Sequence, residues 1–326
     1  MQTMTPVKEN LQTDFQEAKK LVDRHQRIIL VSHEYTDGDD LGAMLAFGLV
    51  LKSQGKMVWE VALGGVPDNL LFLPGQSDVH DELPENLEDY KLLITLGCGT
   101  LARAGFLGLE NWKQEILNID HHADTQMFGT VNVWDEHAAA NCELVYFMLR
   151  EWDAAIDKLS AQNLLTGIFT DTGGFRHANV SAVTFEVAAE LLRRGANLEL
   201  ISRFTFSQKE LPKLRAWSIA LENARFDRNR KMVYTVITSN ELKKVGAKEE
   251  DLEGITELLN TIPEASFSML LKQQGDQIKG SLRSETHKGV DVSQIARAFG
   301  GGGHKLAAGF KFKGIIEKTD EGWKIT

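Results

Sequence analysis

The fold of this chain is decided by residues 28–52, which read IILVSHEYTDGDDLGAMLAFGLVLK. The apolar residues at 28–31 predict a buried strand, and those within 41–52 recur with the spacing of an amphipathic helix. Between these segments lie His33, Asp37 and Asp39, and Gly38 lets the backbone bend between the two aspartates. A buried strand that runs through a polar turn into a helix predicts a parallel α/β sheet whose turns carry functional side chains.

The same alternation continues through the first part of the chain. Further strands are predicted at 58–63, 92–96 and 115–119. Further helices are predicted at 138–152, 159–170 and 182–194. We therefore expect an α/β domain with a doubly wound parallel sheet at residues 1–199.

The pattern changes after residue 200. A helix predicted at 200–223 lies within a helical linker assigned to residues 200–229. Strands are then predicted at 232–238, 266–273, 277–283 and 308–312, with a helix at 292–299. This second pattern predicts a smaller mixed-sheet α/β domain at residues 230–326, with helices on one face of its sheet.

The composition is that of an ordinary globular protein, with 43% hydrophobic and 25% charged residues. No stretch approaches the roughly 18 apolar residues of a membrane span, and the polar residues 1–20 show no export signal. Two cysteines, Cys98 and Cys142, are too few for a disulfide framework, so we expect a cytoplasmic protein. The net charge of −10 argues against binding long nucleic acid, but bound cations would still allow a small phosphate substrate.

Carboxylates and imidazoles gather in three places that we expect at strand ends. His33, Asp37 and Asp39 form the first group, Asp120-His121-His122 the second, and Asp171 the third. These are ligand types for divalent cations, and a pair of cations suits chemistry on phosphate.

Each group also has an ordinary alternative. Asp39 or Asp40 could cap the following helix, a lone histidine is commonly a core or surface residue, and Asp171 could begin a turn. The three groups together favour a metal site more strongly than any one alone.

The second domain carries a glycine run, Gly300–Gly303, followed by His304. Such a run allows backbone amides to approach an anion, although plain hairpin loops are equally glycine-rich. Arg283 offers a forked donor for a terminal phosphate, with an ordinary surface charge as its alternative.

The three groups of carboxylates and imidazoles and the glycine-His304 motif form four motifs. In this order over almost the whole chain, they resemble the DHH phosphoesterases with a DHHA1 domain. The length and the absence of added modules are most similar to the bacterial nanoRNase and pAp-phosphatase branch. The resemblance implies one manganese ion held by His33 and Asp37, and a second held by Asp39, His121 and Asp171. It implies catalytic roles for Asp120 and His122 near these ligands, and substrate binding by Arg283, Gly301, Gly302, Gly303 and His304.

The resemblance further implies hydrolysis of short oligonucleotides (nanoRNA), of 3′-phosphoadenosine 5′-phosphate (pAp), or of both. We expect no membrane or long-duplex partner, and a homodimer is possible. A pyrophosphatase is disfavoured because that branch lacks the glycine-His304 motif, and a processive exonuclease is disfavoured by the acidic net charge.

One position departs from the family pattern. The family's second motif ends its strand with an aspartate that bridges both cations, and Gly97 stands at that position here, with Arg103 keeping the usual spacing. Glycine offers no ligand, so the chain could be a catalytically impaired nucleotide-binding protein, or hold only one cation firmly.

The third possibility is that a nearby acid replaces the missing aspartate. The candidates are Glu34, Asp40 and Asp124, with Asp124 the most movable of the three. On this alignment, Gly97→Asp is expected to raise manganese stoichiometry and hydrolysis together.

Overall fold

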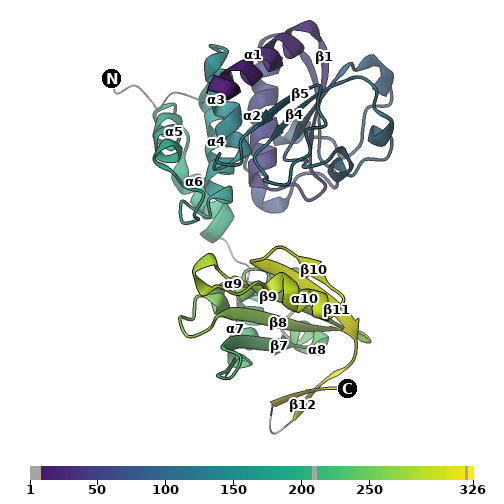
Figure 1. The fold of residues 1–326 in the computed structure, drawn as a ribbon, viewed down its shortest axis with the longest axis vertical. Helices are drawn as coiled ribbons and strands as arrows, with labels where there is room; N and C mark the ends of the chain where they lie inside the picture. Colours follow the sequence, from purple (N-terminus) through teal and green to yellow (C-terminus); the bar gives the residue numbers. More distant parts are fainter. Residues whose placement is uncertain (1–8, 208–210, 320–321) are drawn as a thin grey trace. The chain divides into compact units, whose positions relative to one another are not determined.

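The computed structural model describes residues 9–207, 211–319 and 322–326 (Figure 1). The chain divides into two compact units, Met1–Gln208 and Lys209–Thr326. Among the described residues, no helix has the length and apolar character that crossing a bilayer requires.

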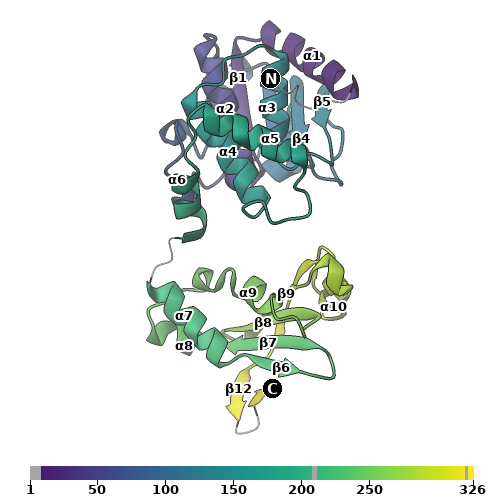
Figure 2. The ribbon, with the colours of Figure 1, turned by 90° about the vertical axis from the view of Figure 1, so that its left-hand side faces the viewer.

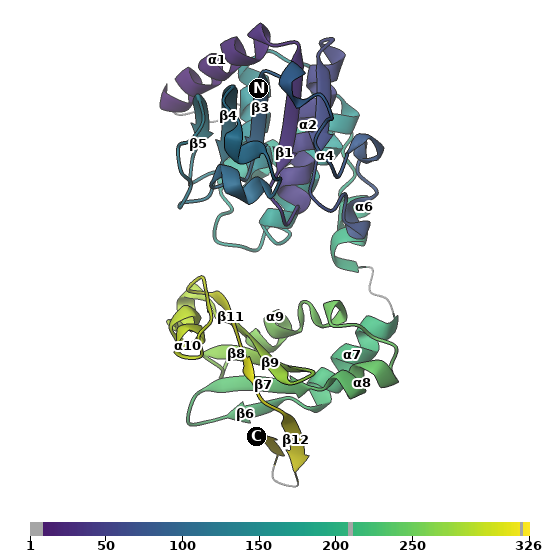
Figure 3. The same ribbon diagram turned by 90° about the vertical axis from the view of Figure 1, so that its right-hand side faces the viewer.

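The first unit is built on a five-stranded sheet, in which every neighbouring pair of strands is parallel. The strands are β1 (Arg27–Ser32), β2 (Met57–Val61), β3 (Leu92–Leu96), β4 (Glu115–Asp120) and β5 (Val131–Trp134). Their order is β2-β1-β3-β4-β5, and Figure 3 shows β5, β4, β3 and β1 across the sheet. The predicted parallel α/β fold is confirmed.

Helices cover one face of this sheet (Figure 2). The helices that contact its strands are α1 (Glu9–Arg24), α2 (Gly38–Ser53) and α3 (Asn141–Glu151). Against these pack α4 (Lys158–Asp171), then α5 (Ala182–Arg193) and α6 (Leu198–Ser202). The side chains of Ile28 and Leu30 face these helices, whereas Ile29 and Val31 face the opposite side. Alternation along a strand therefore divides one continuous apolar run between two cores.

The opposite face is covered by loops and short 3₁₀ turns instead of long helices. The 3₁₀ turns that contribute to this core are Leu87–Asp89, Leu101–Ala104 and Leu109–Asn111. Leu109 and Ala104 from two of these turns are buried against Ile29 and Leu93. Two further turns are Asp68–Leu70, whose Leu70 belongs to the core on the helix side, and Gln76–Asp78. Both faces are thus protected from water, as a parallel sheet requires.

The strand order reverses direction at β1, because the chain passes from β1 to β2 on one side and returns to β3 on the other. Ser32 pairs with Leu96, and Leu96 pairs with Ile119. The next residues of the three strands, His33, Gly97 and Asp120, therefore emerge together at one edge. This is the place where open α/β sheets bind ligands.

The second unit contains a six-stranded mixed sheet, ordered β10-β11-β9-β8-β7-β6. Its strands are β6 (Arg225–Asp227), β7 (Met232–Ile237), β8 (Phe267–Gln274), β9 (Gln277–Arg283), β10 (Gly302–Gly303) and β11 (Ala307–Lys313). β7 and β8 are parallel, and the other pairs are antiparallel. A terminal hairpin follows, formed by β12 (Ile316–Thr319) and β13 (Gly322–Ile325). The smaller mixed-sheet domain is confirmed.

Helices lie on both faces of this second sheet, not on one face as the sequence suggested. They are α7 (Leu211–Glu222), α8 (Ser239–Lys244), α9 (Ile255–Asn260) and α10 (Val292–Ala298), with 3₁₀ turns at Glu250–Leu252 and Thr286–Lys288. α7, α8 and α9 contribute to the core that contains Ile237 and Leu270. α10 and the terminal hairpin contribute to the core that contains Val236 and Leu271.

The single helix predicted across residues 200–223 is replaced by three segments. α6 is followed by a π-helical turn, Arg203–Ser207, and α7 begins at Leu211, while residues 208–210 lie outside the described part of the chain. The π-helical turn interrupts the regular α-helical path that the prediction assumed. α7 packs inside the second unit through Ala216 and Ala220.

The packing of β9 against β11 gives a test of the second core. Phe310 pairs with Gly280, and a Cβ at position 280 would lie 2.2 Å from the Phe310 ring. Gly280→Ala is therefore expected to lower the free energy of unfolding by about 1–3 kcal/mol, as overpacking does. Urea unfolding of the full chain measures this change. Gly302→Ala is the control, because a Cβ there meets nothing within 4 Å; equal losses in both variants would contradict the packing.

Candidate metal centre

Six side chains at the carboxyl edge of the first sheet form two groups that could each hold a metal ion. The first group is His33, Asp37 and Asp40, and the second is Asp39, His121 and Asp171. Within each group, one ligand atom from every residue lies within 4.8 Å of the others. The structure thus brings together all five predicted metal ligands and adds Asp40 to them.

The first group forms where β1 passes into α2. His33 follows β1 and is 6% exposed, with Nε2 lying 2.8 Å from Asp40 Oδ2 and 3.9 Å from Asp37 Oδ2. Burial lowers the pKa of His33, but the contacts with Asp37 and Asp40 outweigh burial and raise that pKa to about 10. The site therefore stabilises a positive charge between its two carboxylates.

Asp37 has two functions in this turn. Its Oδ1 accepts hydrogen bonds from the backbone amides of Asp39 (2.9 Å) and Asp40 (3.1 Å), which caps α2. Its Oδ2 faces His33. The sequence analysis considered Asp39 or Asp40 as the cap of α2, and this is wrong because Asp37 is the cap. Capping uses one oxygen of Asp37 and leaves the other able to bind a cation.

The second group joins three elements. His121 Nε2 lies 3.8 Å from Asp39 Oδ2 and 3.8 Å from Asp171 Oδ2. His121 Nδ1 lies 3.2 Å from the carbonyl oxygen of Ala138, which can only accept, so Nδ1 donates and Nε2 keeps its lone pair. Asp171 is the last residue of α4, which corrects the expectation that every group would follow a strand.

Asp39 is held by the first turn of α3. Its carboxylate accepts from the backbone amides of Asn141 (2.6 Å) and Cys142 (2.9 Å), while the N-cap residue Ala140 contributes no side-chain hydrogen bond. A carboxylate of α2 thus supplies the missing cap of α3. The amides fix Asp39 with its Oδ2 toward His121.

The buried carboxylates carry an electrostatic cost. Burial raises the pKa of both Asp39 and Asp171 to about 7, and the charges of neighbouring carboxylates add to this rise. Burial, and then the charge of Asp37, also raises the pKa of Asp40. Carboxylates gathered in this way are stable as anions when cations lie between them, which fits the donor set to a pair of divalent ions.

Asp120 and His122 form a pair beside the two groups. Asp120 is fully buried, and its Oδ1 lies 2.7 Å from His122 Nδ1 while its Oδ2 accepts from Thr125 Oγ1 at 2.7 Å. Both oxygens of Asp120 are therefore engaged, which fits a residue that orients His122 better than one that binds a cation. Their catalytic roles stay a prediction.

The predicted binding residues of the second unit also lie close together. Arg283 ends β9 and pairs with Ala307, while Gly303 pairs with Ala308 on the same strand. His304 is exposed in the tight turn that closes this hairpin, with its amide 2.8 Å from the Ala307 carbonyl oxygen. Arg283 Nε donates to Glu257 Oε1 at 2.6 Å, so part of its guanidinium is engaged.

The glycines of this motif differ in their surroundings. A Cβ at Gly301 would lie 2.1 Å from the Gly309 carbonyl oxygen, and one at Gly303 would lie 2.6 Å from the Ala307 carbonyl oxygen. These two glycines allow strands to approach closely, as the plain hairpin alternative requires. Gly302 faces open space, so an anion-binding role applies best to this position.

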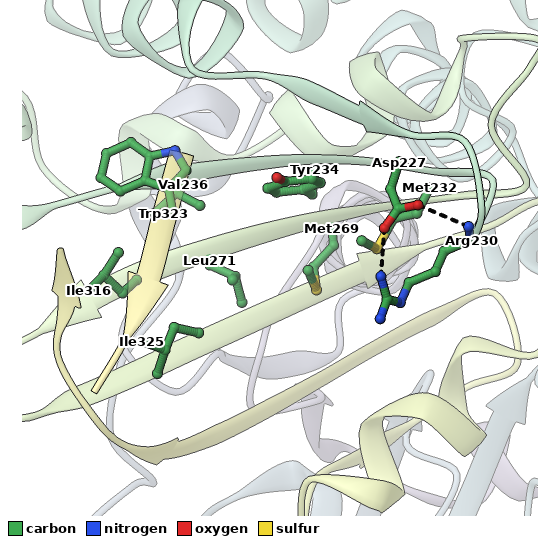
Figure 4. Close-up of a pocket in the computed structure, with 10 residues that line it drawn as sticks. All are labelled: Asp227, Arg230, Met232, Tyr234, Val236, Met269, Leu271, Ile316, Trp323 and Ile325. Carbon is green, nitrogen blue, oxygen red and sulfur yellow. Dashed lines mark hydrogen bonds and ion pairs between the residues drawn. The ribbon is translucent and has the colours of Figure 1, made fainter. Parts of the chain in front are cut away.

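A cavity of about 220 Å³ in the second unit lies between the sheet and the terminal hairpin (Figure 4). Its lining is mostly apolar, from Met232, Met269, Leu271 and Trp323, with the Asp227–Arg230 ion pair at one end. None of the predicted site residues lines it.

Gly97 follows β3 with φ +64, and a Cβ there would lie 2.1 Å from Asp40 Oδ1. Of the three acids considered as substitutes, Asp40 alone belongs to either ligand group in the described residues, and Asp124 is exposed. Among the three candidates, the geometry therefore favours Asp40. The sequence analysis also did not identify Asn141 as a residue of the site. Its one signal in the sequence is that it is a polar residue at the start of an apolar helix.

Comparison with known proteins gives consistent matches. Residues 27–168 match the DHH family, N-terminal domain, and residues 229–323 match the DHHA1 domain. The bifunctional oligoribonuclease and PAP phosphatase NrnA of Thermus thermophilus is 32% identical over 293 residues, covering 88% of this chain and 85% of that protein.

Two solved structures share the fold. An exopolyphosphatase-related protein from Bacteroides fragilis superposes with a TM-score of 0.83 at 25% identity, covering 97% of this chain and 94% of that chain. The exonuclease RecJ bound to manganese superposes with a TM-score of 0.55 at 16% identity, covering 95% and 91% of the two chains.

The two functions of Asp37 can be separated by a matched pair of variants. Asp37→Ala removes both the cap and the carboxylate, whereas Asp37→Ser retains a hydroxyl that can cap α2. Without metal, Asp37→Ala is expected to be less stable than Asp37→Ser by about 0.5–2 kcal/mol. Urea unfolding with a chelator measures this difference, and Mn²⁺ titration should show equally weakened binding in both. Wild-type Mn²⁺ binding by Asp37→Ser would exclude Asp37 as a ligand.

Proposed function

The chain belongs to the DHH family and carries a DHHA1 domain, and on this premise we propose that it is a manganese-dependent phosphoesterase. Its substrates would be short oligonucleotides, 3′-phosphoadenosine 5′-phosphate, or both. The observation that carries the proposal is the pair of ligand groups at the carboxyl edge of the parallel sheet.

The donor sets agree with two divalent ions. His33, Asp37 and Asp40 would hold one ion, and Asp39, His121 and Asp171 the other. A pair of such ions activates water and stabilises negative charge on phosphate oxygens. The choice of manganese is supported by the mixed oxygen and imidazole ligands and by the manganese named for RecJ, which shares the fold.

The protein's own groups would orient the phosphate. Asp120 binds His122 Nδ1 and so directs the opposite edge of the imidazole away from the carboxylate. That pairing raises the pKa of His122, through the hydrogen bond first and the charge of Asp120 as well. A protonated His122 would donate to a phosphate oxygen, and Asp120 would act by positioning it.

The substrate class is supported by the Thermus thermophilus relative, whose name gives oligoribonuclease and PAP phosphatase activities. The net charge of −10 favours short substrates over long nucleic acid. In the second unit, the donors of Arg283 and His304 and the open backbone at Gly302 would bind nucleotide phosphate or base. A cytoplasmic location and a homodimer stay predictions.

The second candidate is a protein that binds nucleotides without hydrolysing them. Gly97 favours it, because the aspartate of the family motif is missing there. The presence of Asp40 in the first ligand group weighs against it.

Hydrolysis assays separate the two candidates. With Mn²⁺, the protein is expected to release AMP from an adenylate dinucleotide, or phosphate from pAp, and a chelator should abolish both reactions. His121→Ala should reduce the rate by at least about 10–100-fold, because losing a ligand costs no less than losing its supporting partner. Asp124→Ala, at an exposed acid outside both groups, is the control and should retain the wild-type rate.

A binding titration with the same two nucleotides completes the test. Binding without release, even at high Mn²⁺, would contradict the phosphoesterase and favour the binding protein.

A further inference from the structure

We propose that Asp40 supplies, from the first turn of α2, the metal-binding carboxylate that this chain lacks at position 97 at the end of β3. The inference rests on the two-cation centre of the proposed function and assigns a ligand to it. It gives the first ion a third protein ligand, which comes from a helix instead of from the end of a strand.

The space around Gly97 carries the first part of the argument. β1 and β3 are adjacent, and Gly97 follows Leu96, the pairing partner of Ser32. A Cβ built on Gly97 would lie 2.1 Å from Oδ1 and 2.5 Å from both Cγ and Oδ2 of Asp40. The carboxylate of Asp40 thus occupies the volume into which a side chain at position 97 would point.

The hydrogen bonds of Asp40 carry the second part. Asp40 is 2% exposed, and its Oδ1 accepts from Asn141 Nδ2 at 2.8 Å. Its Oδ2 lies 2.8 Å from His33 Nε2 as an ion pair, and this imidazole is the single contact of that oxygen in the described part of the chain. A buried carboxylate oxygen whose one neighbour is the imidazole of another candidate ligand already faces a positive charge, and a cation between the two would take the place of that proton.

Ligand number and charge agree with this assignment. With Asp40, each ion has three protein ligands, whereas His33 and Asp37 alone would leave the first ion with two. Asp37, Asp39, Asp40 and Asp171 then supply four negative charges against the four positive charges of two divalent ions. Asn141 is a positioning residue, because it fixes Asp40 Oδ1 and leaves Oδ2 for the ion.

The geometry also makes positions 40 and 97 alternatives. A single Gly97→Asp substitution would place two carboxylates in one volume, at a backbone φ of +64 that L-residues seldom adopt. The earlier expectation that Gly97→Asp raises metal binding is therefore reversed. Asp40→Ala frees the volume, and aspartate is among the residues that tolerate this φ best.

The test exchanges the two positions in the full-length protein. Mn²⁺ stoichiometry and affinity are measured by equilibrium titration, and electron paramagnetic resonance distinguishes coupled from isolated Mn²⁺. Wild type is expected to bind two coupled ions per chain. Asp40→Asn, and separately Gly97→Asp, should weaken the first site at least about tenfold and give the spectrum of isolated Mn²⁺. The double variant Asp40→Ala/Gly97→Asp should regain two coupled ions.

Controls keep the outcomes distinguishable. Asp40→Asn keeps the shape of the side chain, unfolding curves in a chelator confirm its fold, and Asp124→Asn should bind as wild type does. Two coupled ions at wild-type affinity in Asp40→Asn would overturn the assignment while leaving the phosphoesterase intact. Two coupled ions that disappear in Asp40→Asn, without hydrolysis of either nucleotide by wild type, would support the assignment and contradict the proposed function. Absence of Mn²⁺ binding by wild type would overturn both.

Discussion

The constraint on which the structure of the first unit depends is the burial of several carboxylates at one edge of a parallel sheet. Asp39, Asp40 and Asp120 are each 2% exposed or less. Their negative charges are stabilised by amides and an asparagine side chain of α3, by His122 after β4 and by His33 after β1, so the partners come from three segments. The sheet order, the start of α3 and the turn after β1 must all be in place before such a cluster can form.

Much of this edge was predictable because it depends on local sequence. The apolar runs that become β1, β3 and β4 are each followed at once by a polar turn, so His33, Gly97 and Asp120 could be assigned to strand ends. Parallel pairing then brings these ends together. A residue can cap a helix and also belong to the site, because Asp37 both caps α2 and faces His33.

The rest depends on contacts that sequence does not display. Asp37, Asp39 and Asp40 look alike in sequence, and only the direction of the first turn of α2 separates their roles. The helix predicted at 200–223 is interrupted by the π-helical turn Arg203–Ser207, for which the periodicity of the sequence gave no signal. β5 and the terminal hairpin were missed because strands of four residues give too little alternation to recognise.

Asn141 contacts a carboxylate of each ligand group. Its backbone amide binds Asp39, whose carboxylate belongs to one ligand group, and its side chain binds Asp40, whose carboxylate belongs to the other. One residue of α3 therefore acts as a spacer between the two groups. The position of α3 on the sheet would then set the distance between the two cations. A core substitution that shifts α3 would therefore change metal binding even where it contacts no ligand.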